Sequence, residues 1–215
     1  ISQDSANLVS NLDAVEAVTG ISSLPEPAEG CSKIPADASI EFDKVSFRYE
    51  EDGHLALDEV SFSVPSGSTC AIVGPSGSGK STVASLMARF WDVSSGSVRV
   101  GGVDVREMTS DTLMSQMSLV FQDVSLFKAS LLDNIRMARP DATSEEVMAA
   151  AKAAQADEFI RALPQGYETV YGSDGVHLSG GEKQRVSIAR AILADRPIVV
   201  LDEATAFADP ENEHL

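Results

Sequence analysis

The sequence has 215 residues, of which 43% are hydrophobic, so it is long enough to form a good-sized domain with a real hydrophobic core. Its formal net charge of −17 argues against a nucleic-acid partner, because binding to a phosphate backbone depends on Lys and Arg side chains that displace counterions. No window approaches the roughly 20 apolar residues that a membrane-spanning helix needs, and no secretory signal peptide opens the sequence.

The N-terminal segment indicates a helix followed by a linker. Apolar residues recur there at spacings near i+3 and i+4, which a helix would gather into one stripe, namely Leu8, Val9, Leu12, Val15 and Val18. Residues 20–30 are rich in proline, glycine and acidic side chains, a composition typical of an extended linker. We therefore expect residues 1–39 to precede a compact domain that spans residues 40–215. The absence of an initiator methionine indicates a piece of a larger polypeptide.

The first part of the compact domain predicts a β-rich region. Residues 40–49 alternate apolar and polar side chains as a half-buried strand does, and residues 57–68 repeat this pattern before a turn. Residues 71–74, with the sequence AIVG, form a continuous apolar run that is typical of a strand buried on both faces of a parallel sheet. Residues 81–90 follow with helical spacing, so the predicted order is strand, glycine-rich turn, helix.

The second part predicts helices and one further strand. Residues 143–163 are rich in helix formers, and Ser144 with Glu145 and Glu146 makes a suitable helix start. Residues 181–194 indicate another helix, and the sequence PIVVLDE at residues 197–203 indicates another buried strand. Strands and helices in this order favour an α/β fold.

The glycine-rich turn matches a phosphate-binding loop. It has the spacing of glycine, four residues, glycine, lysine and serine or threonine, and it comprises Gly74, Pro75, Ser76, Gly77, Ser78, Gly79, Lys80, Ser81 and Thr82. Its backbone N–H groups could surround phosphate oxygens, with the positive N-terminus of the following helix facing the same anion. Lys80 would reach the β- and γ-phosphates of a nucleotide, and the Ser81 hydroxyl would ligate Mg²⁺. An ordinary glycine-rich turn is the alternative.

Two acidic residues stand at the end of the last predicted strand. In phosphate-loop enzymes an acidic residue at the tip of a buried strand holds Mg²⁺, so Asp202 is the candidate metal ligand. Glu203 is then placed to polarise the water that attacks the γ-phosphate. In the alternative, Asp202 only caps the turn that follows the strand.

A second nest for an anion is predicted at the start of the helix near residue 181. The sequence LSGGEKQR, residues 178–185, places Ser179, Gly180 and Gly181 there. Since the phosphate-binding loop already surrounds the triphosphate of one ATP, this nest suits the ATP of a partner chain. In this order and at these spacings, the three motifs resemble the nucleotide-binding domain of ABC transporters, and the resemblance covers about residues 40–215.

The resemblance implies a fold and further site residues. The fold is an α/β P-loop NTPase with a β-rich N-terminal subdomain, a helical subdomain inserted at about residues 123–185, and its C-terminal part missing. Tyr49 would stack on adenine, as an aromatic side chain at a strand end can, although an ordinary sheet aromatic is the alternative. Gln122 would contact Mg²⁺ and the attacking water, and Asp209 would belong to the nucleotide site. Mg²⁺ would thus be held by Ser81, Gln122 and Asp202.

The sequence departs from the family pattern at several positions. Ser173 stands where the segment that communicates with the membrane domain usually has Glu, and Phe207 occupies a loop that commonly reads Ser-Ala-Leu-Asp. The sequence ATAFADPENE, residues 204–213, is similar to that of siderophore-importing members of the exporter-fold class. The family also has a switch histidine after the metal strand, and His214 lies too close to Glu203 to be that residue. We therefore expect the chain to be truncated, to bind nucleotide weakly and to hydrolyse it poorly.

The implied function is an ATPase that drives transport at the cytoplasmic face of the inner membrane. Residues 1–39 would lead from a fused transmembrane domain, although a helix packed on its own domain is the alternative. Two nucleotide-binding domains, identical or different, would face each other head to tail, with each ATP between the phosphate-binding loop of one and the nest of the other. Catalysis would depend on Glu203, Gln122 and Lys80.

The solute remains open between classes of transporter. Ferric-siderophore uptake is the first interpretation, and a drug, lipid or peptide exporter is the alternative. A soluble ABC ATPase of DNA repair or translation would share the motifs, but it should carry a basic surface, and this chain is acidic. A regulatory or structural nucleotide-binding module would be expected to lack Glu203 or Ser179, and both are present.

Overall fold

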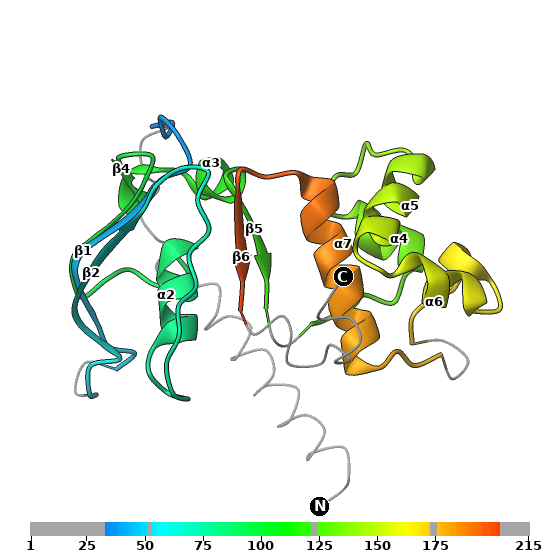
Figure 1. Cartoon of the computed structure of the whole chain (residues 1–215), viewed down its shortest axis with the longest axis horizontal. Coiled ribbons are helices and arrows are strands. Elements are labelled where there is room, and N and C mark those ends of the chain that lie inside the picture. The colour runs from blue at the N-terminus through cyan, green and yellow to red at the C-terminus, as the bar shows by residue number, and fades with distance from the viewer. Residues whose placement is uncertain (1–32, 51–52, 122–123, 173–175, 203–215) are drawn as a thin grey trace, which may run out of the picture.

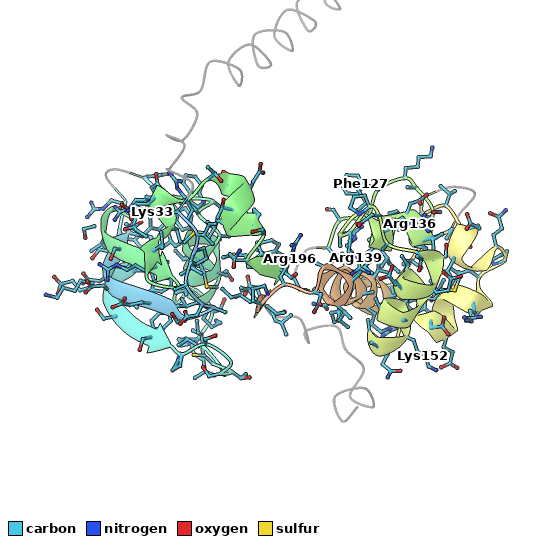
Figure 2. All side chains as sticks on the ribbon, turned by 90° about the horizontal axis from the view of Figure 1, so that it is seen from above. Lys33, Phe127, Arg136, Arg139, Lys152 and Arg196 are labelled. Carbon is cyan, nitrogen blue, oxygen red and sulfur yellow. The ribbon has the colours of Figure 1, made fainter. Side chains whose placement is uncertain are left out.

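The computed structural model describes residues 33–50, 53–121, 124–172 and 176–202. Figure 1 shows an antiparallel sheet on one side, a group of helices on the other, and a short two-stranded sheet between them. Figure 2 shows the same two sides from above. This arrangement confirms the predicted mixed α/β class with a β-rich N-terminal part.

The antiparallel sheet has the strand order β2-β1-β3-β4. Its strands are β1 (Ile40–Phe47), β2 (Leu57–Val64), β3 (Ser95–Val100) and β4 (Val103–Asp104). Strand β1 buries Phe42, Val45 and Phe47 in the core, and an irregularity in its pairing with β2 between Phe42 and Val45 breaks the simple alternation. The rings of Phe42 and Phe62 stack with centroids 4.6 Å apart. Because β1 is the central partner of both β2 and β3, it fixes the position of the loop that follows it at residue 48.

Helix α2 (Lys80–Met87) packs its apolar face against this sheet. Val83, Leu86 and Met87 are buried in the same core as the sheet residues. A 3-10 turn η1 (Val105–Glu107) and helix α3 (Ser110–Met114) then lead to β5 (Met117–Val120). Strand β5 pairs in parallel with β6 (Ile198–Leu201), which brings the end of the described chain beside α2.

The helices of the other side form a second core. They are α4 (Leu131–Arg136), α5 (Ser144–Ala153), α6 (Asp157–Ala162), the 3-10 turn η2 (Gly166–Glu168) and α7 (Gly180–Ala194). Helix α5 begins at Ser144 as expected, and its cap is Thr143, whose side chain accepts a hydrogen bond from Glu146 N. Buried side chains from α4, α5 and α7, such as Ile135, Val147 and Val186, meet in this core. Helix α7 then leads into β6, so it joins the two cores.

Two predictions about buried strands are wrong. Residues 71–74 form no strand, and Val73 is 88% exposed. Residues 198–201 do form β6, but Val199 and Leu201 are more than half exposed, whereas Ile198 is buried. A strand is buried on both faces only when neighbours cover it, and within the described ranges β6 pairs with β5 alone. In the same part of the chain, no helix is both long and apolar enough to cross a bilayer.

Candidate functional site

The phosphate-binding loop, residues 74–82, leads into α2 as the sequence predicts. Helix α2 begins at Lys80, and its N-cap is Gly79, which has no side chain to offer to the first backbone N–H groups. The first intrahelical bond recorded here runs from Val83 N to Gly79 O at 3.0 Å, which leaves the N–H groups of residues 80–82 outside the helical ladder. An uncapped helix N-terminus of this kind is suited to bind an anion.

Gly79 has a geometric reason to be glycine. Its φ is +89°, in the left-handed region, and a Cβ atom there would lie 2.8 Å from Ala56 O and 2.7 Å from Leu57 Cδ2. The backbone of Gly79 therefore lies directly against Ala56 O and the Leu57 side chain at the start of β2. This close approach holds the loop against the antiparallel sheet.

We expect Gly79→Ala to destabilise the protein by at least about 2 kcal/mol, because it adds a steric clash to the cost of a left-handed backbone. The matched control is Gly102→Ala. Gly102 has φ +78° but open space around its Cβ position, so this change should cost only about 1 kcal/mol. Urea unfolding followed by circular dichroism gives both values. Equal losses of unfolding free energy for the two variants would contradict the packing argument.

Lys80 lies folded over the loop. Its Nζ donates hydrogen bonds to Gly74 O and Pro75 O, both at 3.1 Å, and Ser78 N donates to Pro75 O. Both lysine partners are neutral backbone carbonyls on the exposed side of the loop. An anion within the loop could therefore draw the ammonium group to itself without breaking an ion pair.

Ser81 and Asp202 meet although they lie far apart in the sequence. Ser81 Oγ donates to Asp202 Oδ1 at 3.0 Å, and Asp202 N donates to Val120 O at 2.9 Å, so the end of β6 is held beside both α2 and β5. A hydroxyl and a carboxylate together are oxygen donors of the kind that Mg²⁺ prefers. These two residues therefore fit the predicted metal site. Among the described residues no group of three or more His, Cys, Asp and Glu side chains could hold a metal by itself, so phosphate oxygens and water would complete the coordination.

A cavity of about 620 Å³ lies between the phosphate-binding loop and the segment that follows β1. It is lined by Tyr49, Glu50, Gly53, His54, Leu55, Ala56, Ser76, Gly77, Gly79, Lys80, Ser81 and Thr82. The sequence predicted Tyr49 and the loop, but it gave no sign that residues 53–56 contribute. They belong to the connection between β1 and β2, and only the pairing of those strands brings them to the loop.

Tyr49 is held at this cavity by three contacts. Its hydroxyl is hydrogen-bonded to Thr82 Oγ1 at 3.0 Å, and its ring meets those of Phe47 and Trp91 in edge-to-face contacts at 4.8 and 5.5 Å. The side chain is still half exposed. Tyr49 is therefore a fixed aromatic surface beside the loop, with part of its area left for a ligand. The supporting role of Trp91 was not predicted, because nothing in its local sequence links it to Tyr49.

The helix start predicted at residues 179–181 is present as the N-terminus of α7. Ser179 is the N-cap of α7: its Oγ accepts from Glu182 N at 3.3 Å, and Glu182 Oε2 accepts from Ser179 N at 2.7 Å. Ser179 and Gly180 are exposed. Neither residue lines the cavity at the phosphate-binding loop, and Figure 1 shows α2 and α7 on opposite sides of the β5–β6 pair. The two turns for which the sequence predicts anion binding thus lie apart within one chain.

Several predicted site residues lie outside the described residues. Gln122, Glu203 and Asp209 are among them, as are the departures at Ser173 and Phe207 and the N-terminal helix and linker at residues 1–32. The structure therefore brings together Tyr49, the phosphate-binding loop and Asp202. It places the nest Ser179–Gly181 elsewhere.

Comparison with known proteins identifies relatives of this chain. The sequence profile described as "ABC transporter" matches residues 57–206. The chain is 48% identical over 190 residues to the mycobactin import ATP-binding/permease protein IrtA of Mycobacterium tuberculosis, covering 88% of this chain and 21% of the relative. It is also 48% identical over 191 residues to the ATP-dependent lipid A-core flippase of Haemophilus influenzae strain 86-028NP, covering 88% of this chain and 32% of the relative.

A solved structure shows the same fold. It is that of a bacterial Atm1-family ABC exporter with ATP bound, and it matches with a TM-score of 0.86 and 41% sequence identity. The match covers 94% of this chain and 36% of the exporter chain. The chain thus spans about a third or less of the length of these relatives.

Proposed function

The chain belongs to the ABC transporter family, as the ATPase domain of an exporter-type transporter, and we propose that it binds and hydrolyses ATP to drive the uptake of a ferric siderophore. The observation that carries the ATPase part is the cavity lined by Tyr49 and the phosphate-binding loop, together with the bond from Ser81 in its lining to Asp202. These groups offer an aromatic surface for a base, N–H donors for phosphates and oxygen ligands for a metal.

The proposed chemistry assigns a task to each of these groups. Tyr49 stacks on the adenine, while the free N–H groups at the start of α2 bind the phosphates. Lys80 leaves the carbonyls of Gly74 and Pro75 and donates to the β- and γ-phosphates, where negative charge develops. Ser81 and Asp202 would hold Mg²⁺, which supplies charge neutralisation when bound. Gln122 and Glu203 would orient the attacking water and accept its proton.

A second copy of this domain completes the proposed site. Ser179 and its two glycines form an exposed nest that lies away from the cavity of the same chain. In a head-to-tail pair, each nest would contact the ATP held by the other chain, so that ATP joins the two domains. Its hydrolysis would then release them, and a fused transmembrane domain at the cytoplasmic face of the membrane would convert this cycle into transport. The relatives named ATP-binding/permease proteins support such a fusion.

Two observations support a siderophore as the solute. The loop at residues 204–213 is similar to that of siderophore importers, and one relative is named as a mycobactin importer. The lipid A-core flippase is equally similar over the same share of the chain, so lipid export is the second candidate.

The test uses the native polypeptide that contains this chain, reconstituted in vesicles together with any partner subunit. We expect ATP-dependent accumulation of radiolabelled iron when it is supplied as ferric mycobactin, and no accumulation with the Lys80→Ala variant. ATPase stimulation by lipid A-core, without iron accumulation, would support lipid export and overturn siderophore uptake. A wild-type protein that hydrolyses no ATP would overturn the ATPase proposal itself.

A further inference from the structure

Asn134 forms a buried polar centre at the start of the helical side. It lies in α4, and none of its surface is exposed. Its Nδ2 donates to Phe127 O at 3.0 Å, Ala129 O at 3.2 Å and Ser130 O at 3.0 Å, and its Oδ1 accepts from Phe127 N at 2.9 Å. The segment that leads into α4 is therefore wrapped around one amide group. Burial makes these bonds costly to lose, because an unpaired buried polar group has no water to replace its partner.

Arg190 of α7 joins this centre from the other end of the helical insertion. Its Nε donates to Asn134 O at 2.6 Å, one Nη donates to Asn134 Oδ1 at 2.8 Å, and the other donates to Ser125 O at 3.1 Å. All three acceptors are uncharged. Burial lowers the pKa of the Arg190 guanidinium below its usual value, yet so basic a group keeps its charge.

The bond to Asn134 O replaces a helical one. In a regular helix this carbonyl would accept from Ala138 N, but Ala138 N donates instead to Ile135 O at 3.3 Å. Helix α4 accordingly ends at Arg136, with the guanidinium of Arg190 in place of the next turn. Arg190 thus satisfies a backbone carbonyl at the end of α4, in addition to its contact with the Asn134 side chain.

The contacts of Arg190 join two segments that connect the first core to the second. Residues 124–130 lead into the second core on the outgoing side, and the chain returns to the first core through α7 and residues 195–197. Arg190 lies on the returning connection and bonds to Ser125 on the outgoing one. Together with Asn134, it therefore ties together the two links by which the helical side is attached to the body that carries the phosphate-binding loop (Figure 1).

We propose that this Asn134–Arg190 clamp sets the orientation of α7, so that Arg190 is a positioning residue for the nest Ser179–Gly181. The inference rests on the proposed function, because it assumes that the nest contacts ATP. Arg190 lies ten residues after Gly180, about 15 Å along the helix, so it acts on the nest only through the direction of α7. A change of tilt at the clamp moves the far end of the helix, where the nest must meet a phosphate.

The test compares Arg190→Ala with Arg190→Lys and with the control Arg161→Ala in the native polypeptide that contains this chain. Lysine keeps the charge but cannot make the forked set of bonds. Arg161 is an exposed arginine of α6 that pairs with Asp157, so its loss removes the same charge away from the clamp. ATPase rates are normalised to folded protein. Binding of a fluorescent ATP analogue to the native polypeptide in its undimerised state is measured separately, together with hydrogen exchange at the first turn of α7.

For Arg190→Ala we expect kcat to fall by on the order of tenfold or more, since small displacements of positioning groups have effects of this size. ATP affinity of the undimerised polypeptide should change less than about twofold, because the cavity is intact. Exchange at the start of α7 should become faster, Arg190→Lys should be intermediate, and Arg161→Ala should match the wild type.

Other outcomes would overturn the inference. A normal kcat per folded molecule, or a kcat loss matched by an equal loss of ATP affinity in the undimerised polypeptide, would each show that Arg190 does not position the nest. Failure of the proposed function is a separate result, since it appears as an inactive wild-type protein.

Discussion

Replacing Lys80 with alanine is expected to lower the ATP hydrolysis rate of the native protein by on the order of a hundred- to a thousandfold, the usual effect of removing one donor that stabilises transition-state charge. Among the described residues, the hydrogen bonds of Lys80 Nζ go to the carbonyls of Gly74 and Pro75. The variant therefore loses little stabilisation of the free protein, whereas it loses a charged donor that would stabilise the transition state of hydrolysis. Phosphate release at saturating ATP measures the effect.

The control for Lys80 is Lys152→Ala, which removes one positive charge from the last turn of α5. Figure 2 shows Lys152 on the helical side, away from the phosphate-binding loop. The Lys152→Ala substitution should therefore leave the hydrolysis rate unchanged. Thermal unfolding of the Lys80 variant should match the wild type. A variant that hydrolyses ATP at more than about a tenth of the wild-type rate would show that the lysine has no central part in phosphoryl transfer.

Replacing Asp202 with asparagine is expected to lower the hydrolysis rate by on the order of a hundredfold, because the charge that would hold the metal is removed. Asparagine can still accept the hydrogen bond that Ser81 Oγ now donates to Asp202, and its backbone can still bond to Val120 O. The fold of the site should therefore persist. Titration of the hydrolysis rate with Mg²⁺ should show a markedly higher half-saturating concentration than in the wild type.

Asp195→Asn is the matched control for this change. Asp195 is the C-cap of α7 in a left-handed conformation with φ +50°, which asparagine adopts readily, so the same charge is lost without strain. This control should keep the wild-type Mg²⁺ dependence. If the Asp202 variant showed unaltered Mg²⁺ dependence, Asp202 would not be a metal ligand, and its role would be the structural one of joining β6 to α2.

The parts of the site that were predicted from sequence are those whose chemistry is local. The phosphate-binding loop must place a left-handed glycine before a helix, and the nest at Ser179 is a capping box of neighbouring residues. Such features can be recognised from a short stretch of sequence, because their hydrogen bonds join residues only a few positions apart.

Features that depend on distant partners were missed. Residues 71–74 are as apolar as a buried strand, yet burial depends on which strands pair beside them. Trp91 supports Tyr49, and Arg190 meets Asn134 across 56 positions of sequence, and neither contact has a local signal. The tertiary structure alone brings these pairs together.

The separation of the two anion-binding turns has a consequence for mixed assemblies. In the proposed head-to-tail pair, each chain would lend its phosphate-binding loop to one ATP and its Ser179 nest to the other. If one chain carries a defective loop and its partner a defective nest, both defects meet at a single ATP, and the other ATP is surrounded by intact groups. A pair of two different inactive chains would then regain one of its two ATP sites. A protein with a self-contained site in each chain could not show such complementation.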